Sequence, residues 1–210
     1  SPCLFSSSLI GPCARLAALS KSSSGWWSVT SELLCRLLLQ RGRARIQGVA
    51  DAPHRVWAVD FQSDATTDGR PIKIVSIIDE HTRECLGGLV ERSVTADVLI
   101  DELDRLATQR GYPAVLRCDN GPELACAATA DWAGDRLLLA FIPPGQPWRN
   151  GYIESFNSRV RDECLNINIF WSLAHARVVI GDWKYQYNHH RHSALGYQPP
   201  ARYAANCTHQ

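Results

Sequence analysis

The sequence contains no methionine, no Cys-x-x-Cys pair and no uncharged apolar run of membrane-spanning length. Because it lacks an initiating residue, we expect the sequence to be a fragment of a longer chain or an open-ended translation. Its eight cysteines are scattered without the spacing of a zinc site, so we interpret them as reduced, mostly buried thiols. The opening residues lack the basic start of a secretory signal. We therefore expect a soluble, cytoplasmic protein with no membrane partner.

The formal net charge of +1 hides three segments of different sign. Residues 1–55 hold seven Lys and Arg against two Asp and Glu, which gives +5. Residues 56–170 hold eleven against eighteen (−7), and residues 171–210 hold four against one (+3). Carboxylates gathered in the centre suit cation binding, and basic ends suit a polyanion such as DNA. The alternative is a chance distribution of charge over solvated faces.

Hydrophobic periodicity predicts an α/β domain that begins after residue 50. Alternating and β-branched runs predict strands, period-3.6 patterns predict helices, and the first three strands follow one another as antiparallel neighbours. The glycines within 84–91 indicate a bulge or a close backbone approach. We predict a mixed sheet of three antiparallel strands followed by two parallel strands, flanked by helices. The predicted strands are 54–61, 71–78, 84–91, 114–118 and 137–142, and the predicted helices are 31–41, 95–110, 122–134, 152–165 and 172–187.

Three carboxylates occupy positions at which chemistry is plausible. Asp60 lies within the apolar strand VWAVDF, where an unpaired carboxylate is costly unless a buried arginine, a shifted pKa or a metal ion offsets it. Asp119 ends the strand AVLRC, and sites in open α/β sheets cluster at such strand ends, although Asp119 could instead cap the next helix. Glu154 lies on the polar face of its helix, where a glutamate is more often simply solvated.

These three side chains are expected to converge on one edge of the predicted sheet. Carboxylates held together repel one another unless cations neutralise them. Ligation by oxygen alone favours Mg²⁺ or Mn²⁺ over zinc. Two such ions, about 3.5–4 Å apart, activate a water or a 3′-hydroxyl and stabilise the leaving oxygen in phosphodiester displacement. We therefore predict that Asp60, Asp119 and Glu154 are both the metal ligands and the catalytic residues.

Four segments carry a family resemblance: WAVDF, RCDNGPE, FIPPGQPWRNGYIESFNSRVRDECLN and YNHHRHSALGYQPPA. Over about residues 53–205 the chain resembles the integrase catalytic region of insertion-sequence transposases of the IS-three group. The resemblance implies a ribonuclease H-like fold and a recombinase that nicks element ends and joins 3′-hydroxyls to target DNA. It also implies a requirement for Mg²⁺ or Mn²⁺ and a homo-oligomer on DNA. The chain would divide into an unassigned extension (1–50), the catalytic core (51–170) and a C-terminal helix with a basic tail (171–210) of the same region.

Weaker roles follow from the same resemblance. Asn120 is expected to steady the loop of Asp119, and Asn150 to orient Glu154 from one helical turn away. Bare phosphates need cations and exposed bases need flat partners. Four side chains are therefore candidate DNA contacts, each with structural packing as its alternative: Trp148, Arg149, Asn157 and Arg161. The histidines of NHHRHS are interpreted as a basic tail.

The sequence departs from the family pattern in three places. The gap between Asp119 and Glu154 holds 34 residues, one fewer than is usual, and the NHHRHS tail is also one residue short. Residues 1–50 do not resemble the region that binds element ends. Two alternatives stay open for these reasons: a catalytically inactive remnant that keeps nucleic-acid binding, and a ribonuclease H-like nuclease, which usually presents a fourth carboxylate.

Overall fold

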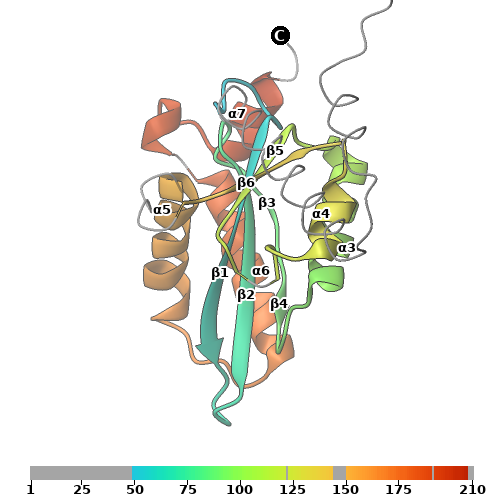
Figure 1. Cartoon of the computed structure of the whole chain (residues 1–210). Coiled ribbons are helices and arrows are strands. Elements are labelled where there is room, and N and C mark those ends of the chain that lie inside the picture. The colour runs from blue at the N-terminus through green and yellow to red at the C-terminus, as the bar shows by residue number, and fades with distance from the viewer. Residues whose placement is uncertain (1–48, 122, 144–149, 191, 208–210) are drawn as a thin grey trace, which may run out of the picture. The chain divides into compact units, whose positions relative to one another are not determined.

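The computed structural model describes one unit of the chain, within Leu39–Gln210. The described residues are 49–121, 123–143, 150–190 and 192–207. The predicted helix at 31–41 and nearly all of the predicted extension lie outside them. A mixed sheet forms the centre of the unit, with helices on both of its faces (Figure 1).

The first strands form the predicted antiparallel layer. β1 (Val56–Ala65) and β2 (Pro71–Asp79) pair as a long hairpin, which extends four residues further along the first strand than predicted. The third strand is split by its glycines into β3 (Cys85–Gly87) and β4 (Val90–Glu91), both antiparallel to β2. Gly88 has a φ of +146°, and a Cβ at this position would lie 2.0 Å from the carbonyl oxygen of Val75. The predicted close backbone approach is therefore confirmed.

The parallel half of the sheet is made of β5 (Val115–Cys118) and β6 (Leu138–Phe141). β5 pairs with β1 in parallel, and β6 pairs with β5 in parallel, which gives the order β3-β2-β1-β5-β6 with β4 also against β2. Three antiparallel strands followed by two parallel ones is the predicted arrangement. The edge of β3 is closed by the side chain of Asn188, which accepts from the N–H of Cys85 and donates to its carbonyl, both at 2.8 Å.

Helices cover the two faces according to the alternation of side chains along β1. Trp57 and Val59 point into a core shared with α3 (Ala96–Arg110) and α4 (Ala127–Ala133), whereas Ala58 points into a core shared with α5 (Gly151–Val160) and α6 (Leu173–His189). Figure 1 shows α3 and α4 on one side of the sheet and α5 on the other. Asp60, two residues beyond Ala58, therefore faces α5.

α3 forms because its leucines repeat at helical spacing. Leu99, Leu103 and Leu106 are all at most 1% exposed, and each fully buried leucine stabilises the fold by about 1.5–3 kcal/mol. The hydroxyl of Thr95 accepts from the N–H of Val98 and caps the start, and Gly111 follows the last residue. The helix predicted at 95–110 is confirmed.

Other elements differ from the predictions at their ends. The helix predicted at 122–134 begins only at Ala127, and before it Leu124 and Ala125 both donate to the carbonyl of Gly121 in a separate turn. After α5 the chain widens into a π-helical turn, Arg161–Leu165. α7 (Pro200–Cys207) was not predicted; proline suits the first turn of a helix, where its missing N–H is not needed. No helix in the described part is long and apolar enough to cross a membrane.

Candidate active site

The sheet register places the first two candidate carboxylates next to each other. Val59 on β1 lies opposite Cys118 on β5, so the following residues, Asp60 and Asp119, are adjacent across the two parallel strands. Neighbouring strands run about 4.8 Å apart. Asp60 is half-buried within β1, and Asp119 follows the last residue of β5.

The third carboxylate comes from α5, which is fastened to β1 beside Asp60. The buried side chain of Asn157 donates its Nδ2 to Asp60 Oδ2 at 2.8 Å. The side chain of Gln62, two residues along β1, donates to the backbone carbonyl of Asn157 at 2.9 Å. Glu154 lies one helical turn before Asn157 and is exposed. These two hydrogen bonds therefore bring the start of α5 over the edge that carries Asp60.

The electrostatics of Asp60 show that the three carboxylates act on one another. Burial is the largest influence and raises the pKa of Asp60, whereas hydrogen bonds from the Phe61 N–H and from Asn157 lower it. The negative charges of Asp119 and Glu154 raise the pKa further. The net result is a carboxyl group whose pKa lies above its ordinary value, within the field of both other members.

Buried glutamates elsewhere among the described residues lie against a cationic side chain. Three glutamates that are at most 8% exposed each pair with an arginine at 2.6–2.8 Å: Glu80 with Arg117, Glu84 with Arg110 and Glu102 with Arg105. Within the described residues, none of the three candidate carboxylates pairs with a lysine, arginine or histidine. Their negative charge is therefore uncompensated by the described protein, which suits a divalent cation.

The side chains do not enclose such an ion as they stand. In the described part of the chain, no group of three or more His, Cys, Asp or Glu residues is arranged to hold a metal. Glu154 is exposed on a long rotatable stem, so its carboxylate would have to turn toward Asp60 and Asp119 to share an ion with them. The oxygen-only donor set fits Mg²⁺ or Mn²⁺ in kind.

The loop after β5 holds Asp119 by hydrogen bonds. The N–H of Gly121 donates to Asp119 Oδ1 at 3.0 Å, and Asn120 Nδ2 donates to the carbonyl of Ile142 at 2.7 Å. A Cβ on Gly121 would lie 3.0 Å from Asp119 Oδ1 and 3.2 Å from Glu123 Oε2. A side chain at this position would therefore require both carboxylates to shift slightly. Asn120 contacts Ile142, and its steadying role stays a prediction.

The sequence analysis missed a second interaction that holds this loop, an ion pair between Lys73 on β2 and Glu123. The ammonium of Lys73 also lies 4.7 Å above the ring centroid of Phe61, the residue after Asp60. Burial is the largest single influence on Glu123 and raises its pKa, but the hydrogen bond from Lys73, a backbone hydrogen bond and the charge of Lys73 together outweigh it, so the net pKa lies below its ordinary value. The only signal in the sequence was the motif DNGPE, which contains Glu123 but does not indicate that it pairs with a residue fifty positions away.

The remaining predicted contacts divide three ways. Asn157 is only 6% exposed and donates to Asp60, which fits the packing alternative, and its DNA contact stays a prediction. Arg161 donates to the Ser63 carbonyl at 2.9 Å but keeps 38% of its side chain exposed, so its DNA contact stays a prediction. Asn150 is buried at the start of α5 and forms no hydrogen bond with Glu154 among the described residues. Trp148 and Arg149 lie outside the described residues.

Known proteins with similar sequences come from insertion elements. Two family models, both described as "Integrase core domain", match residues 50–147 and 136–200. An uncharacterized 31.7 kDa protein of insertion element IS407 from Burkholderia multivorans is 41% identical over 171 residues, covering 80% of this chain and 61% of the relative. An uncharacterized 39.2 kDa protein of IS476 from Xanthomonas euvesicatoria is 44% identical, covering 73% and 45%. The transposase of IS629 from Shigella sonnei is 26% identical, covering 76% and 54%. The chain therefore spans about half of the length of these relatives.

Solved structures with the same fold are viral integrases. The catalytic core domain of HTLV-2 integrase in complex with magnesium, in its trimeric form, aligns with a TM-score of 0.57 at 12% identity, covering 73% of this chain and 98% of that one. A chain of the simian T-cell lymphotropic virus intasome in complex with the PP2A regulatory subunit B56 gamma aligns with a TM-score of 0.59 at 14% identity, covering 73% and 55%. At these identities the likeness shows the fold alone. That fold is the expected ribonuclease H-like mixed sheet.

Proposed function

The chain belongs to the integrase core domain family, and from that premise we propose that it is the catalytic core of an insertion-element transposase. Its substrates would be the DNA ends of the element and a target DNA, and it would act as a homo-oligomer on them. One observation carries the proposal: Asp60 lies in the field of Asp119 and Glu154, and the described protein supplies no cation to any of the three. Such a cluster is costly unless a bound cation completes it.

The three carboxylates would hold Mg²⁺ or Mn²⁺ as a pair of ions. Bound there, the ions would supply the activation of a water or 3′-hydroxyl and the stabilisation of the leaving oxygen in phosphodiester displacement.

The chain's own residues prepare the ligands for this chemistry. Asn157 donates to Asp60 and so favours its ionised form and fixes its orientation. The N–H of Gly121 fixes the orientation of Asp119, while the bond from Asn120 to Ile142 holds the loop against the end of β6. Among the described residues, Glu154 is the one ligand whose carboxylate accepts no hydrogen bond. Its approach would therefore accompany ion binding.

A second candidate function is cleavage of RNA–DNA hybrids by a ribonuclease H-like nuclease. The observation in its favour is Glu123, a fourth carboxylate whose Oε2 lies beside the same glycine as Asp119. Lys73 pairs with Glu123, however, which opposes a role for that carboxylate as a metal ligand. Strand joining on DNA therefore remains the function that the site supports better.

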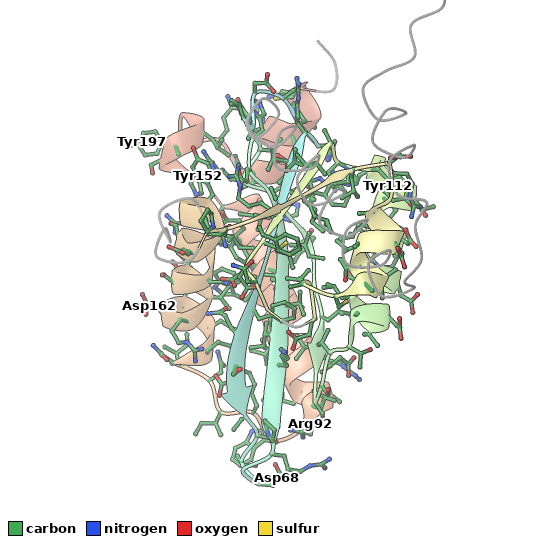
Figure 2. All side chains as sticks on the ribbon, viewed as in Figure 1. Asp68, Arg92, Tyr112, Tyr152, Asp162 and Tyr197 are labelled. Carbon is green, nitrogen blue, oxygen red and sulfur yellow. The ribbon has the colours of Figure 1, made fainter. Side chains whose placement is uncertain are left out.

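The proposal is tested by incubating the chain with element-end DNA and target DNA in Mn²⁺ and measuring nicking and strand joining. Asp60→Asn should lower both by roughly 100-fold or more, since even the outer partners of metal ligands are worth 10–100-fold. The matched control is Asp162→Asn, which removes an exposed carboxylate whose side chain points away from the sheet (Figure 2).

Each outcome of this experiment selects one function. Equal activity in Asp60→Asn and in the parent chain would contradict the proposal. Cleavage of RNA–DNA hybrids without any strand joining would select the nuclease. Tight DNA binding with no metal-dependent cleavage of either substrate would identify an inactive remnant.

A further inference from the structure

A cavity of about 410 Å³ lies outside the carboxylate site, between α5 with its π-helical turn and the end of α6 with the tail that follows. Cavities that bind small ligands start at about 300 Å³. Its walls include Arg159, Glu163, Trp183, Tyr187, His190 and His192. Arg159, Glu163, Tyr187, His190 and His192 come from the two segments of family resemblance nearest the C-terminus, and Trp183 lies between those segments; none of these residues takes part in the carboxylate site. The catalytic function therefore leaves this cavity unexplained.

One wall of the cavity is a fixed aromatic surface. The ring of Trp183 stacks on that of Tyr187, with centroids 5.5 Å apart and planes 27° apart. Phe156 meets both rings edge-on, at 5.6 Å from Trp183 and 4.8 Å from Tyr187. Trp183 itself is only half-buried. A rigid and partly open indole is a surface on which a flat ring can stack with little loss of entropy.

The polar groups of the cavity are incompletely paired. Arg159 forms no ion pair within the described residues, although Glu163 lines the same cavity. Burial, followed by the charges of Arg159 and Arg83, lowers the pKa of His192, so its ring is neutral near pH 7. The Nδ1 of His192 is buried without a hydrogen-bond partner. Buried polar atoms of this kind are usually satisfied, so the hydrogen bonding of this wall is incomplete among the described residues.

We propose that this cavity binds one nucleotide of a single DNA strand, with the base stacked on Trp183 and its phosphate paired with Arg159. Glu163 accepts a hydrogen bond from an exocyclic amino group, which cytosine and adenine carry and thymine lacks. The assignment rests on the proposed function in that it takes DNA as the substrate. Arg159 lies five residues after Glu154 on one helix, about 140° around the axis and about 7.5 Å along it. The two side chains therefore lie on different flanks of α5, and a strand would have to cross this helix to reach both sites.

The test uses labelled ten-nucleotide strands of dC or dT, titrated with the full chain in EDTA so that metal binding plays no part. Arg159→Gln should weaken binding of the dC strand about 10-fold and reduce its salt dependence by about one phosphate contact. The matched control is Arg202→Gln, which removes the same charge from an exposed position on α7 and should change binding less than twofold. Glu163→Gln should remove the preference for dC over dT. Circular dichroism of each variant confirms that the fold is kept.

Three results would overturn the assignment. If Arg159→Gln and Arg202→Gln lose the same affinity for the dC strand, the loss reflects the net charge of the protein and not a phosphate contact in the cavity. An unchanged preference in Glu163→Gln would remove the base contact. Free dCMP that binds as tightly as the ten-nucleotide strand would identify a mononucleotide ligand instead. Because binding is measured without metal and strand joining with metal, a failed cavity and a failed catalytic function give different results.

Discussion

Replacing Asp60 by asparagine should make the protein more stable at neutral pH while it removes a metal ligand. The Asp60 carboxylate is half-buried, lies in the negative field of Asp119 and Glu154, and pairs with no described cation. Asparagine has nearly the same shape, and its side-chain oxygen can still accept from Asn157. The substitution therefore removes the charge and leaves the packing in place.

The size of the gain follows from the spacing of the strands. Two like charges 4 Å apart repel by about 4 kcal/mol at an effective dielectric constant of 20, and by about 2 kcal/mol at twice that distance. Water at this half-open edge screens the interaction further, which leaves a gain on the order of 1 kcal/mol in the free energy of unfolding. For a domain of this size, that gain raises the melting temperature by about 2–4 °C.

The gain should depend on pH with a definite sign. A carboxyl group whose pKa is raised on folding binds more protons in the folded chain than in the unfolded one, above its ordinary value of 3.8. The stability that Asp60 contributes is therefore lost as pH rises from that value through the raised pKa. The advantage of Asp60→Asn should be present at pH 7 and absent below the ordinary value.

Thermal melts in EDTA from pH 3 to pH 8 measure the effect, with Asp162→Asn as the control that should leave the midpoint unchanged. Addition of Mg²⁺ should then favour the parent chain, by about 2.7 kcal/mol at a concentration of 100 times its dissociation constant. An Asp60→Asn protein that melts below the parent at pH 7 in EDTA would refute the reasoning, because it would mean that the folded protein stabilises this charge.

Two further substitutions test the residues that hold the carboxylates. Asn157→Ala removes the hydrogen bond to Asp60 and should lower strand-joining activity about 10–100-fold. Since that bond lowers the pKa of Asp60, the acidic limb of the pH–rate profile should also move to higher pH, and an unmoved limb would argue against a positioning role. Lys73→Glu alone should slow strand joining by loosening the Asp119 loop, and the exchange Lys73→Glu with Glu123→Lys should restore much of the rate. Both side chains are partly buried, at 28% and 18% exposure. If the exchanged variant is no more active than either single variant in a double-mutant cycle, the ion pair does not hold the Asp119 loop in place.

The sequence predicted best those elements whose pattern repeats within a few residues. The helix α3 and the two long strands of the hairpin were predicted because the residues of a buried face are apolar and recur at the period of the helix or strand. The start of α4 and the whole of α7 were misjudged, since Gly121 and Pro200 carry the same local signals in a turn and at a helix start.

The three ligands of the candidate site stay a prediction, and the residues that support them were not foreseen in full. Asn157 shares a helix face with Glu154, and a polar face reads as solvent-exposed in a sequence. In the fold that face lies over the edge of β1, which turns Asn157 toward Asp60. The pair of Lys73 and Glu123 joins residues fifty positions apart, and no periodicity reports a contact of that separation.

Calorimetric titration of Mn²⁺ into the chain and its variants tests the central claim most directly. Asp60→Asn, Asp119→Asn and Glu154→Gln should each abolish or strongly weaken binding, whereas Asp162→Asn should bind like the parent. The Glu154→Gln variant is the most informative of the three, because the gap of 34 residues between Asp119 and Glu154 is one short of the usual length. Binding that is unchanged in Glu154→Gln, or in either aspartate variant, would contradict a metal site built from these three carboxylates.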